Sequence, residues 1–422
     1  MNPLCIDLFA GPGGLGEGFT RSGFKIAFSV EKEALECQTL TLRKAQHLSR
    51  KEGINLGYKG DLNLDNLKKF FPEVYNSARS RVKQIELGVN PFSEIYELIR
   101  ETKREAGKRP MVLLGGPPCQ AYSLAGRARQ LGGISSSQHE RKIDEFYSDK
   151  RHTLYREYLK VLSIFSPDIF IMENVKGILS ARTSKDAEKG SVIDLIISDL
   201  KNPSEAMAND ISYLKELKAL DIRMEKSEYI LVPLTARLAL NLFGAAGNIY
   251  EPRDFLIKSE EHGIPQTRHR VIICGIRKDI YERLGKPDTI KEAPIATVSD
   301  VIGKFPPIKS NITRKNIPED NWGKAVTDEI KRLTGIPSPW INQSAPFSKN
   351  LKKATIKGNP LLKNFLNDTE EKITDHKSRS HMISDLARYY FCANFAEINQ
   401  RSPKLEDWPT GELAPNHRDI IK

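Results

Sequence analysis

The stretch Leu4-Cys5-Ile6-Asp7-Leu8-Phe9-Ala10-Gly11-Pro12-Gly13-Gly14-Leu15-Gly16 (residues 4–16) decides the fold. Its apolar half, Leu4–Phe9, is typical of a short buried strand, and a glycine-rich turn and a helical pattern follow it. The glycines satisfy the pattern G-x-G-x-x-G, and Glu31 stands twenty residues beyond Gly11. Such a carboxylate can accept hydrogen bonds from ribose hydroxyls. Taken alone, the loop fits a nicotinamide or flavin enzyme, and it fits an enzyme that uses S-adenosylmethionine equally well.

Strand and helix patterns alternate along the rest of the chain. The expected strands are 26–30, 111–114, 169–172 and 270–276, and the expected helices lie within 33–50, 62–109, 152–165 and 189–245. This alternation predicts an α/β fold with a doubly wound, mostly parallel sheet. Beyond about residue 280 the periodicity weakens, and Pro, Lys, Asn and Ser increase. We therefore expect one domain over 1–280 and a smaller C-terminal region over 281–422.

The composition indicates where the protein is located and which class of partner it binds. The 422 residues hold five scattered cysteines without a CxxC pair, and no apolar run of about 18 residues that could cross a membrane. The first residues show neither the basic nor the apolar region of a signal peptide, so we expect a cytoplasmic protein. The formal net charge of +11 favours a polyanionic partner such as a nucleic acid.

Cys119 is the candidate nucleophile. A lone cysteine is more often a small core residue than a reactive thiol. Cys119, however, directly follows Gly116-Pro117-Pro118, which comes after the strand predicted at 111–114. Consecutive prolines fix the backbone and stop a strand, so the thiol is expected on a rigid loop at the carboxyl end of that strand. Ligands and chemistry gather at this edge of open α/β sheets.

Two further clusters stand next to predicted strands. Glu173-Asn174-Val175 ends the strand at 169–172, where a carboxyl is costly unless it has a task or a partner, although a helix-capping acid is an alternative. Gln266-Thr267-Arg268-His269-Arg270 precedes the last strand. Arg268 and Arg270 alternate on an extended segment and therefore point to the same side. They could hold a phosphate or the polar edge of a base, or they could form an exposed charged strand edge.

In combination, these segments resemble the DNA (cytosine-5)-methyltransferases. Residues 7–14 match the cofactor motif of that family and residues 116–120 its nucleophile motif. Residues 173–175 and 266–270 match two further motifs, and all four stand in the order of the family. The resemblance covers roughly residues 4–280 and implies the fold of S-adenosylmethionine-dependent methyltransferases.

The resemblance also implies a set of roles. Cys119 would add to carbon-6 of a cytosine flipped out of double-stranded DNA, and Glu173 would hydrogen-bond the exocyclic amine and protonate ring N3. Arg268 and Arg270 would hold the O2 edge and the adjacent phosphate. The residues that would line the S-adenosylmethionine pocket are Phe9, Gly11, Gly13, Glu31, Asp61, Pro117 and Leu154. The further DNA contacts would be Gln120, Ser123 and Gln266, and no metal is expected.

The C-terminal part departs from the family pattern. Two C-terminal segments of the family are not found: Arg-x-Leu-Thr…Gln-x-Phe-Pro, and Gly-Asn-x-Val, whose helix completes the cofactor pocket. Residues 297–307 and 376–408 resemble the start of a target-recognition region. We therefore expect a split enzyme in which a second protein subunit supplies the missing parts. One alternative is a self-sufficient methyltransferase with diverged or truncated closing elements. Others are a catalytically weak or inactive DNA- or nucleotide-binding subunit and a transfer-RNA cytosine methyltransferase. On DNA the protein is expected to be associated with the nucleoid.

Overall fold

The computed structural model describes residues 2–54, 56, 63–118, 154–182, 188–235, 250–303, 305, 308, 312, 322–334, 362–363, 366 and 378–408. The chain forms two compact units, Met1–Leu131 with Ser135–Ile295 and Gly132–Ile134 with Ala296–Lys422. The boundary after Ile295 lies beyond the position near 280 that the sequence suggests. The reason is that Ile290 and Ala293 form isolated bridges with Thr235 and His262, which tie this segment to the first unit.

An eight-stranded sheet organises the described part of the first unit. Its order is β3-β2-β1-β4-β5-β8-β6, and β7 also pairs with β8. The strands are β1 (Leu4–Leu8), β2 (Lys25–Glu31), β3 (Val82–Gln84), β4 (Met111–Gly115), β5 (Ile169–Val175), β6 (Tyr229–Val232), β7 (Leu256–Lys258) and β8 (His269–Arg277). The first five strands pair in parallel, whereas β8 runs antiparallel to β5, β6 and β7. The predicted α/β fold with a mostly parallel sheet is confirmed.

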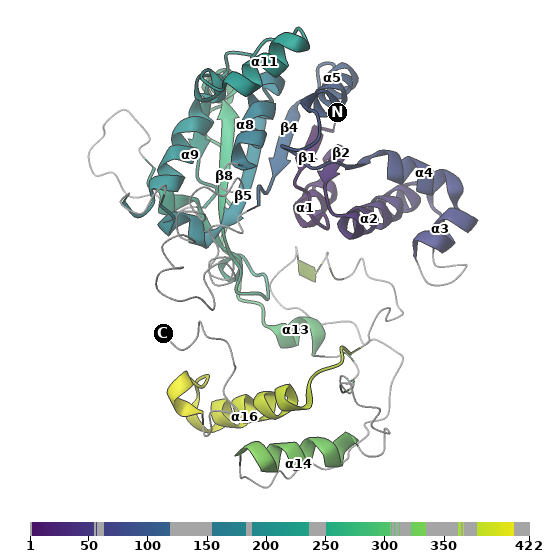
Figure 1. Cartoon of the computed structure of the whole chain (residues 1–422), viewed down its shortest axis with the longest axis vertical. Coiled ribbons are helices and arrows are strands. Elements are labelled where there is room, and N and C mark those ends of the chain that lie inside the picture. Colours follow the sequence, from purple (N-terminus) through teal and green to yellow (C-terminus); the bar gives the residue numbers. More distant parts are fainter. Residues whose placement is uncertain are drawn as a thin grey trace. The chain divides into compact units, whose positions relative to one another are not determined.

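Helices cover both faces of this sheet (Figure 1). They are α1 (Gly14–Arg21), α2 (Ala34–Glu52), α3 (Leu64–Phe70), α4 (Pro72–Ser80), α5 (Phe92–Ala106), α8 (Leu154–Phe165), α9 (Ser191–Lys201), α10 (Pro203–Met207), α11 (Ile211–Ala219) and α12 (Lys278–Leu284), with single 3-10 turns η3 (Lys176–Ser180), η4 (Pro252–Phe255) and η5 (Ser259–Glu261). The apolar sides of α5, α8 and α9 pack on one face of the sheet, and α1 and α12 pack on the other. The strands are thus buried on both faces, as a parallel sheet requires.

The structure corrects the sequence prediction at two short strands. The helical patterns expected over 62–109 and 189–245 contain β3 and β6, which have three and four residues. Runs of this length are too short to show a period of two against a helical background. Helix α1 begins at Gly14, inside the glycine-rich stretch, and β5 extends through Glu173 and Asn174 to Val175.

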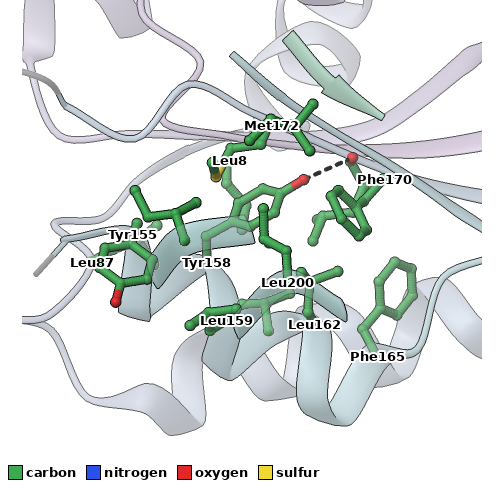
Figure 2. Packing of buried hydrophobic residues seen from close by; sticks show 14 of the residues in the cluster. Leu8, Leu87, Tyr155, Tyr158, Leu159, Leu162, Phe165, Phe170, Met172 and Leu200 are labelled. Atoms are coloured by element: carbon green, nitrogen blue, oxygen red, sulfur yellow. Dashed lines mark hydrogen bonds between the residues drawn. The ribbon is translucent and has the colours of Figure 1, made fainter. Parts of the chain in front are cut away.

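Tyr158 of α8 packs against β4 and β5 and links the two strands through its hydroxyl. Its ring lies among Leu8, Phe170 and Met172 (Figure 2), and its buried hydroxyl lies 3.1 Å from the carbonyl oxygens of both Leu113 and Ile171. The strand β4 passes the same ring at Gly115, where a Cβ would lie 2.6 Å from a ring carbon. Only glycine fits at this point, directly before the loop that leads to Cys119.

The described part of the second unit is helical. It contains α13 (Val298–Ile302), α14 (Trp322–Thr334), α16 (Ile383–Asn399) and a 3-10 turn η7 (Leu405–Asp407). Val326, Ile330 and Leu333 of α14 bury against Ala387 of α16, and Trp408 packs on Phe391 with ring centroids 4.9 Å apart. Within the described ranges of the whole chain, no helix is long and apolar enough to cross a membrane.

Candidate active site

The candidate site lies where the parallel strands end. Because β1, β2, β4 and β5 run in the same direction, their carboxyl ends share one edge of the sheet (Figure 1). The strand order reverses between β1 and β4, and ligands of doubly wound sheets bind at such a switch point. Glu31 is the last residue of β2, Phe9 and Gly116 directly follow β1 and β4, and Glu173 stands two residues before the end of β5. The structure therefore brings together the described parts of three predicted motifs.

The glycine loop between β1 and α1 adopts left-handed backbone conformations. Gly11 and Gly13 have φ of +54° and +91°. Phe9 has φ of +52°, a backbone conformation that residues other than glycine rarely adopt. Strain of this kind is held by the surrounding structure and is common at ligand-binding loops. A Cβ on Gly13 would lie 2.6 Å from Leu40 of α2, whereas a Cβ on Gly11 would meet no atom within 4 Å. The loop is thus tightly packed at Gly13 and open at Gly11.

Glu31 at the end of β2 holds this loop. Its Oε2 accepts a hydrogen bond from the backbone N–H of Gly11 at 2.8 Å, and its Oε1 accepts from the N–H groups of Lys32 and Glu33 at 2.8 and 3.0 Å. Hydrogen bonds to a charged acceptor are stronger than those between neutral groups. The carboxylate expected to face a ribose therefore also fixes the open end of the glycine loop.

Asp7 is a buried carboxyl beneath the same loop. It is 1% exposed on β1, and the backbone of α1 lies so close that a Cβ on Gly16 would be 2.7 Å from Oδ2. Among the described residues, Oδ2 has no hydrogen-bond partner. Burial raises the pKa of Asp7 to about 7, although the charge of Lys44 opposes this shift. Asp7 belongs to the predicted cofactor motif at residues 7–14, but the residue pattern alone indicates no role for it.

Glu17 joins α1 to α2 behind the loop. Its Oε2 lies 2.7 Å from His47 Nε2 and 3.1 Å from Arg43, and its Oε1 accepts from Arg21 at 2.7 Å. The hydrogen bond with His47 contributes most to lowering the pKa of Glu17 to about 2. The carboxylate therefore stays charged at neutral pH and braces the two helices that carry the loop.

Glu173 lies against the two arginines that the sequence places on one side of a strand. Arg270 Nε lies 2.7 Å from Glu173 Oε1, and an outer nitrogen of Arg268 lies 3.6 Å from the same oxygen. The other oxygen, Oε2, would be 3.1 Å from a Cβ on Gly116. The carboxylate is therefore positioned between the arginines and Gly116. Gly116 is the first residue after β4 and begins the segment that leads to Cys119, here called the Cys119 loop.

The remaining predicted residues fall into two groups. Pro117 is buried and its carbonyl accepts from Asn174, Leu154 begins α8 and is half-buried, and Gln266 is exposed. Four predicted site residues, Asp61, Cys119, Gln120 and Ser123, lie outside the described residues. Asn174 belongs to the motif at residues 173–175, and the residue pattern alone indicates no role for it. Its position next to Glu173 on a strand is the sequence signal that marks it.

The chain resembles known DNA methyltransferases. A family model described as C-5 cytosine-specific DNA methylase matches residues 90–200 and 234–381. The type II methyltransferase M.Bpa9945I of Bacillus paralicheniformis is 25% identical over 72% of this chain and 61% of its own length. M.DdeI of Desulfomicrobium norvegicum is 22% identical over 72% of this chain and 49% of its own length. M.AquIA of Picosynechococcus is 23% identical over 73% of this chain and 90% of its own length. The chain thus spans about three fifths and half of the first two relatives.

The matched ranges include residues 116–120, 173–175 and 266–270, three of the four quoted motifs. They continue to residue 381, beyond residues 4–280, the range that the motif resemblance covers. The absence of the closing motifs remains a prediction. Because the model matches more than half of the 422 residues, the chain belongs to the C-5 cytosine-specific DNA methylase family.

Proposed function

We propose that the protein methylates carbon-5 of cytosine in double-stranded DNA, with S-adenosylmethionine as methyl donor. The observation that carries the proposal is the contact of Glu173 with Arg270 at 2.7 Å, with Gly116 of the Cys119 loop on its other side. A proton donor, two cations and a thiol loop are the groups that activation of a cytosine ring needs. Family membership supports the same conclusion.

The chemistry follows from the low reactivity of cytosine carbon-5. The thiolate of Cys119 forms a bond to carbon-6, and Glu173 gives a proton to ring N3, so that carbon-5 becomes the nucleophilic end of an enamine. After methyl transfer, loss of the proton from carbon-5 and breakage of the sulfur–carbon-6 bond release the product. The ring cannot react inside a base stack, so the nucleotide is flipped out of the duplex.

The cofactor loop supports S-adenosylmethionine as the donor. Glu31 offers a carboxylate at the tip of β2, and the space beside Gly11 is open, which allows a ligand to approach the backbone. The cofactor, when bound, supplies an electrophilic methyl group. Phe9, Gly13, Asp61, Pro117 and Leu154 complete the proposed pocket by their positions in the family motifs.

Arg268 and Arg270 are proposed to change partners when DNA binds. Both contact Glu173 through Oε1, and Arg268 is half-exposed at 49% of its side chain. A base and its phosphate would offer the guanidinium groups new acceptors and leave Glu173 to face the ring. Gln120, Ser123 and Gln266 are proposed as further DNA contacts, and the net charge of +11 suits a polyanion.

A second polypeptide is proposed to complete the enzyme. Neither of the two C-terminal family patterns, Arg-x-Leu-Thr…Gln-x-Phe-Pro and Gly-Asn-x-Val, stands within 281–422. The match with M.AquIA covers 90% of the length of that relative, so little of its sequence lies outside the matched part. The complete enzyme would work in the cytoplasm on nucleoid DNA, as the methyltransferase of a restriction-modification pair. Bisulfite mapping of DNA exposed to this chain, with and without the product of the neighbouring gene, tests this: equal methylation in both samples would contradict the need for a partner.

Covalent trapping tests the central chemistry. DNA with 5-fluorocytosine blocks the final elimination, so an active enzyme accumulates as an adduct that mass spectrometry detects. We expect the wild-type chain to form this adduct in the presence of S-adenosylmethionine and the neighbouring gene product, and Cys119→Ser to form none. An adduct in the Cys119→Ser protein would disprove the assignment of the nucleophile. A wild-type chain without an adduct would disprove the proposed reaction.

A further inference from the structure

We propose that Asn174 is a positioning residue that holds the Cys119 loop at the correct place against the sheet. The inference rests on the proposed function, because that function makes Cys119 the nucleophile. Asn174 is 4% exposed on β5, directly after Glu173. Its Nδ2 donates to the carbonyl oxygen of Pro117 at 3.5 Å. Pro117 stands two residues before Cys119, so the contact reaches the stem of the loop.

The position of this contact follows from the pairing of β4 with β5. The last paired residues are Gly115 and Met172, so the continued register would place Pro117 beside Asn174. Pro117 and Pro118 have no N–H group, so the backbone ladder cannot continue through them. The carboxamide of Asn174 supplies a donor at the point where the ladder stops. The side chain thus gives the Pro117 carbonyl oxygen a hydrogen-bond donor beyond the last paired residues of β4 and β5.

The amide of Asn174 is held in one orientation. Its Oδ1 accepts from the backbone N–H of Val175 at 2.9 Å, which leaves Nδ2 to face Pro117. Glu173 contacts the preceding loop residue, with Oε2 3.1 Å from a Cβ position on Gly116. Successive residues of a strand point to opposite faces of the sheet. The stem of the loop is therefore contacted from both faces by two neighbouring residues of β5.

Loss of the Asn174 donor should affect the reaction step more than binding. A nucleophile held about 1 Å from its productive position can lose about 100-fold in rate. No described contact ties Asn174 to the glycine loop of the cofactor site or to Arg268 and Arg270. The expected effect is slower bond formation between sulfur and carbon-6, with unchanged affinity for DNA and S-adenosylmethionine.

Three variants of the full chain separate positioning from general stability. Asn174→Asp keeps the shape and the acceptor for Val175 but turns an oxygen toward the Pro117 carbonyl, and Asn174→Ala removes both bonds. The matched control is Tyr229→Phe, because the Tyr229 hydroxyl also donates to a proline carbonyl, that of Pro167, at 2.9 Å. Pro167 precedes β5 at its opposite end. Should the Asp variant not fold, Asn174→Ser is uncharged and too short to reach Pro117, and takes its place.

The readout is the single-turnover rate of adduct formation on 5-fluorocytosine DNA, at saturating DNA and S-adenosylmethionine and with the neighbouring gene product present. It is measured at a temperature where circular dichroism shows each variant folded. We expect the Asn174 variants to be slower by about 10- to 100-fold, with unchanged Kd values, and Tyr229→Phe to lower Tm but keep the wild-type rate. Wild-type rates in the Asn174 variants, or an equal loss in Tyr229→Phe, would overturn the positioning role alone. A wild-type chain without adduct would overturn the proposed function and this role with it.

Discussion

Substitution of Gly16 tests how the cofactor loop is supported. A Cβ at Gly16 of α1 would lie 2.7 Å from Asp7 Oδ2, whereas ordinary contacts begin near 3.4 Å. Asp7 is 1% exposed, so its carboxyl cannot simply turn into solvent to avoid the new methyl group. Gly18 stands two residues further along the same helix, and a Cβ there meets no atom within 4 Å. Gly18→Ala is therefore a matched control for Gly16→Ala.

Gly16→Ala and Gly18→Ala share one contribution to stability, the helix propensity of alanine, and differ in the cost of overpacking. Each replaces glycine by alanine in a helix, which is worth up to about 1 kcal/mol in favour of alanine. Only Gly16→Ala adds the cost of overpacking, about 1–3 kcal/mol. We expect Gly18→Ala to be stabilising by about 0.5–1 kcal/mol and Gly16→Ala to be less stable than Gly18→Ala by about 1–3 kcal/mol. Because α1 begins directly after Gly13, its displacement should also weaken S-adenosylmethionine binding.

Urea unfolding measures the stabilities, and calorimetric titration with S-adenosylmethionine measures the affinities. Asp7→Ala removes the carboxyl and makes room for the new methyl group. Gly16→Ala should therefore cost at least about 1 kcal/mol less in the Asp7→Ala background than in the wild type. Equal stability of Gly16→Ala and Gly18→Ala, or strict additivity with Asp7→Ala, would refute the packing of α1 on this carboxyl.

Three further substitutions test the charges of the site. Glu31→Ala removes the acceptor of three backbone N–H groups and should weaken S-adenosylmethionine affinity by about 10- to 100-fold in calorimetric titration. Glu173→Gln keeps the shape but lowers proton donation, so adduct formation should slow by about 100-fold or more while DNA affinity in a filter-binding assay changes little. Glu17 has a pKa lowered from 4.5 to about 2 by the hydrogen bond with His47, so its stabilisation is complete above pH 4.5 and is lost as the pH falls toward 2. Urea unfolding should therefore show Glu17→Gln less stable than the wild type at pH 6 and nearly equal to it at pH 2; a constant difference would contradict the ion-pair role.

The edge of the sheet where the site lies could be predicted from the sequence. Such a prediction needs only the direction of the strands and the alternation of side chains along them. The carboxyl ends of parallel strands share one edge, so Glu31 and Glu173 had to lie at the same edge once both were placed at strand ends. The period of two in extended chain placed Arg268 and Arg270 on one side, and both indeed contact Glu173. These inferences need only local residue patterns.

The pairing partners could not be predicted in this way. The arginines were expected to face a phosphate or a base, and the pattern gave no sign that a carboxylate of another strand would bind them. That contact exists because β8 inserts antiparallel beside β5 and places Arg270 opposite Val175. Strand order depends on contacts between residues about 100 positions apart, which local patterns do not encode. The three residues of β3 and the four of β6 were missed for the same reason, since the sheet rather than their own pattern makes them strands.

The register of β5 against β8 is what the candidate site depends on most. Side chains alternate between the two faces of a sheet. A shift of the β5–β8 pairing by one residue would therefore turn Glu173 to the face that Asn174 occupies and would separate it from Arg270. Gly275 blocks such a slip: it is paired with Phe170, and a Cβ there would lie 2.1 Å from the aromatic ring. The ring can pass over β8 only at this glycine, because the neighbouring positions of the strand carry Cys274 and Ile276. This core glycine thus determines which side chains of β5 face the arginines and which face Pro117.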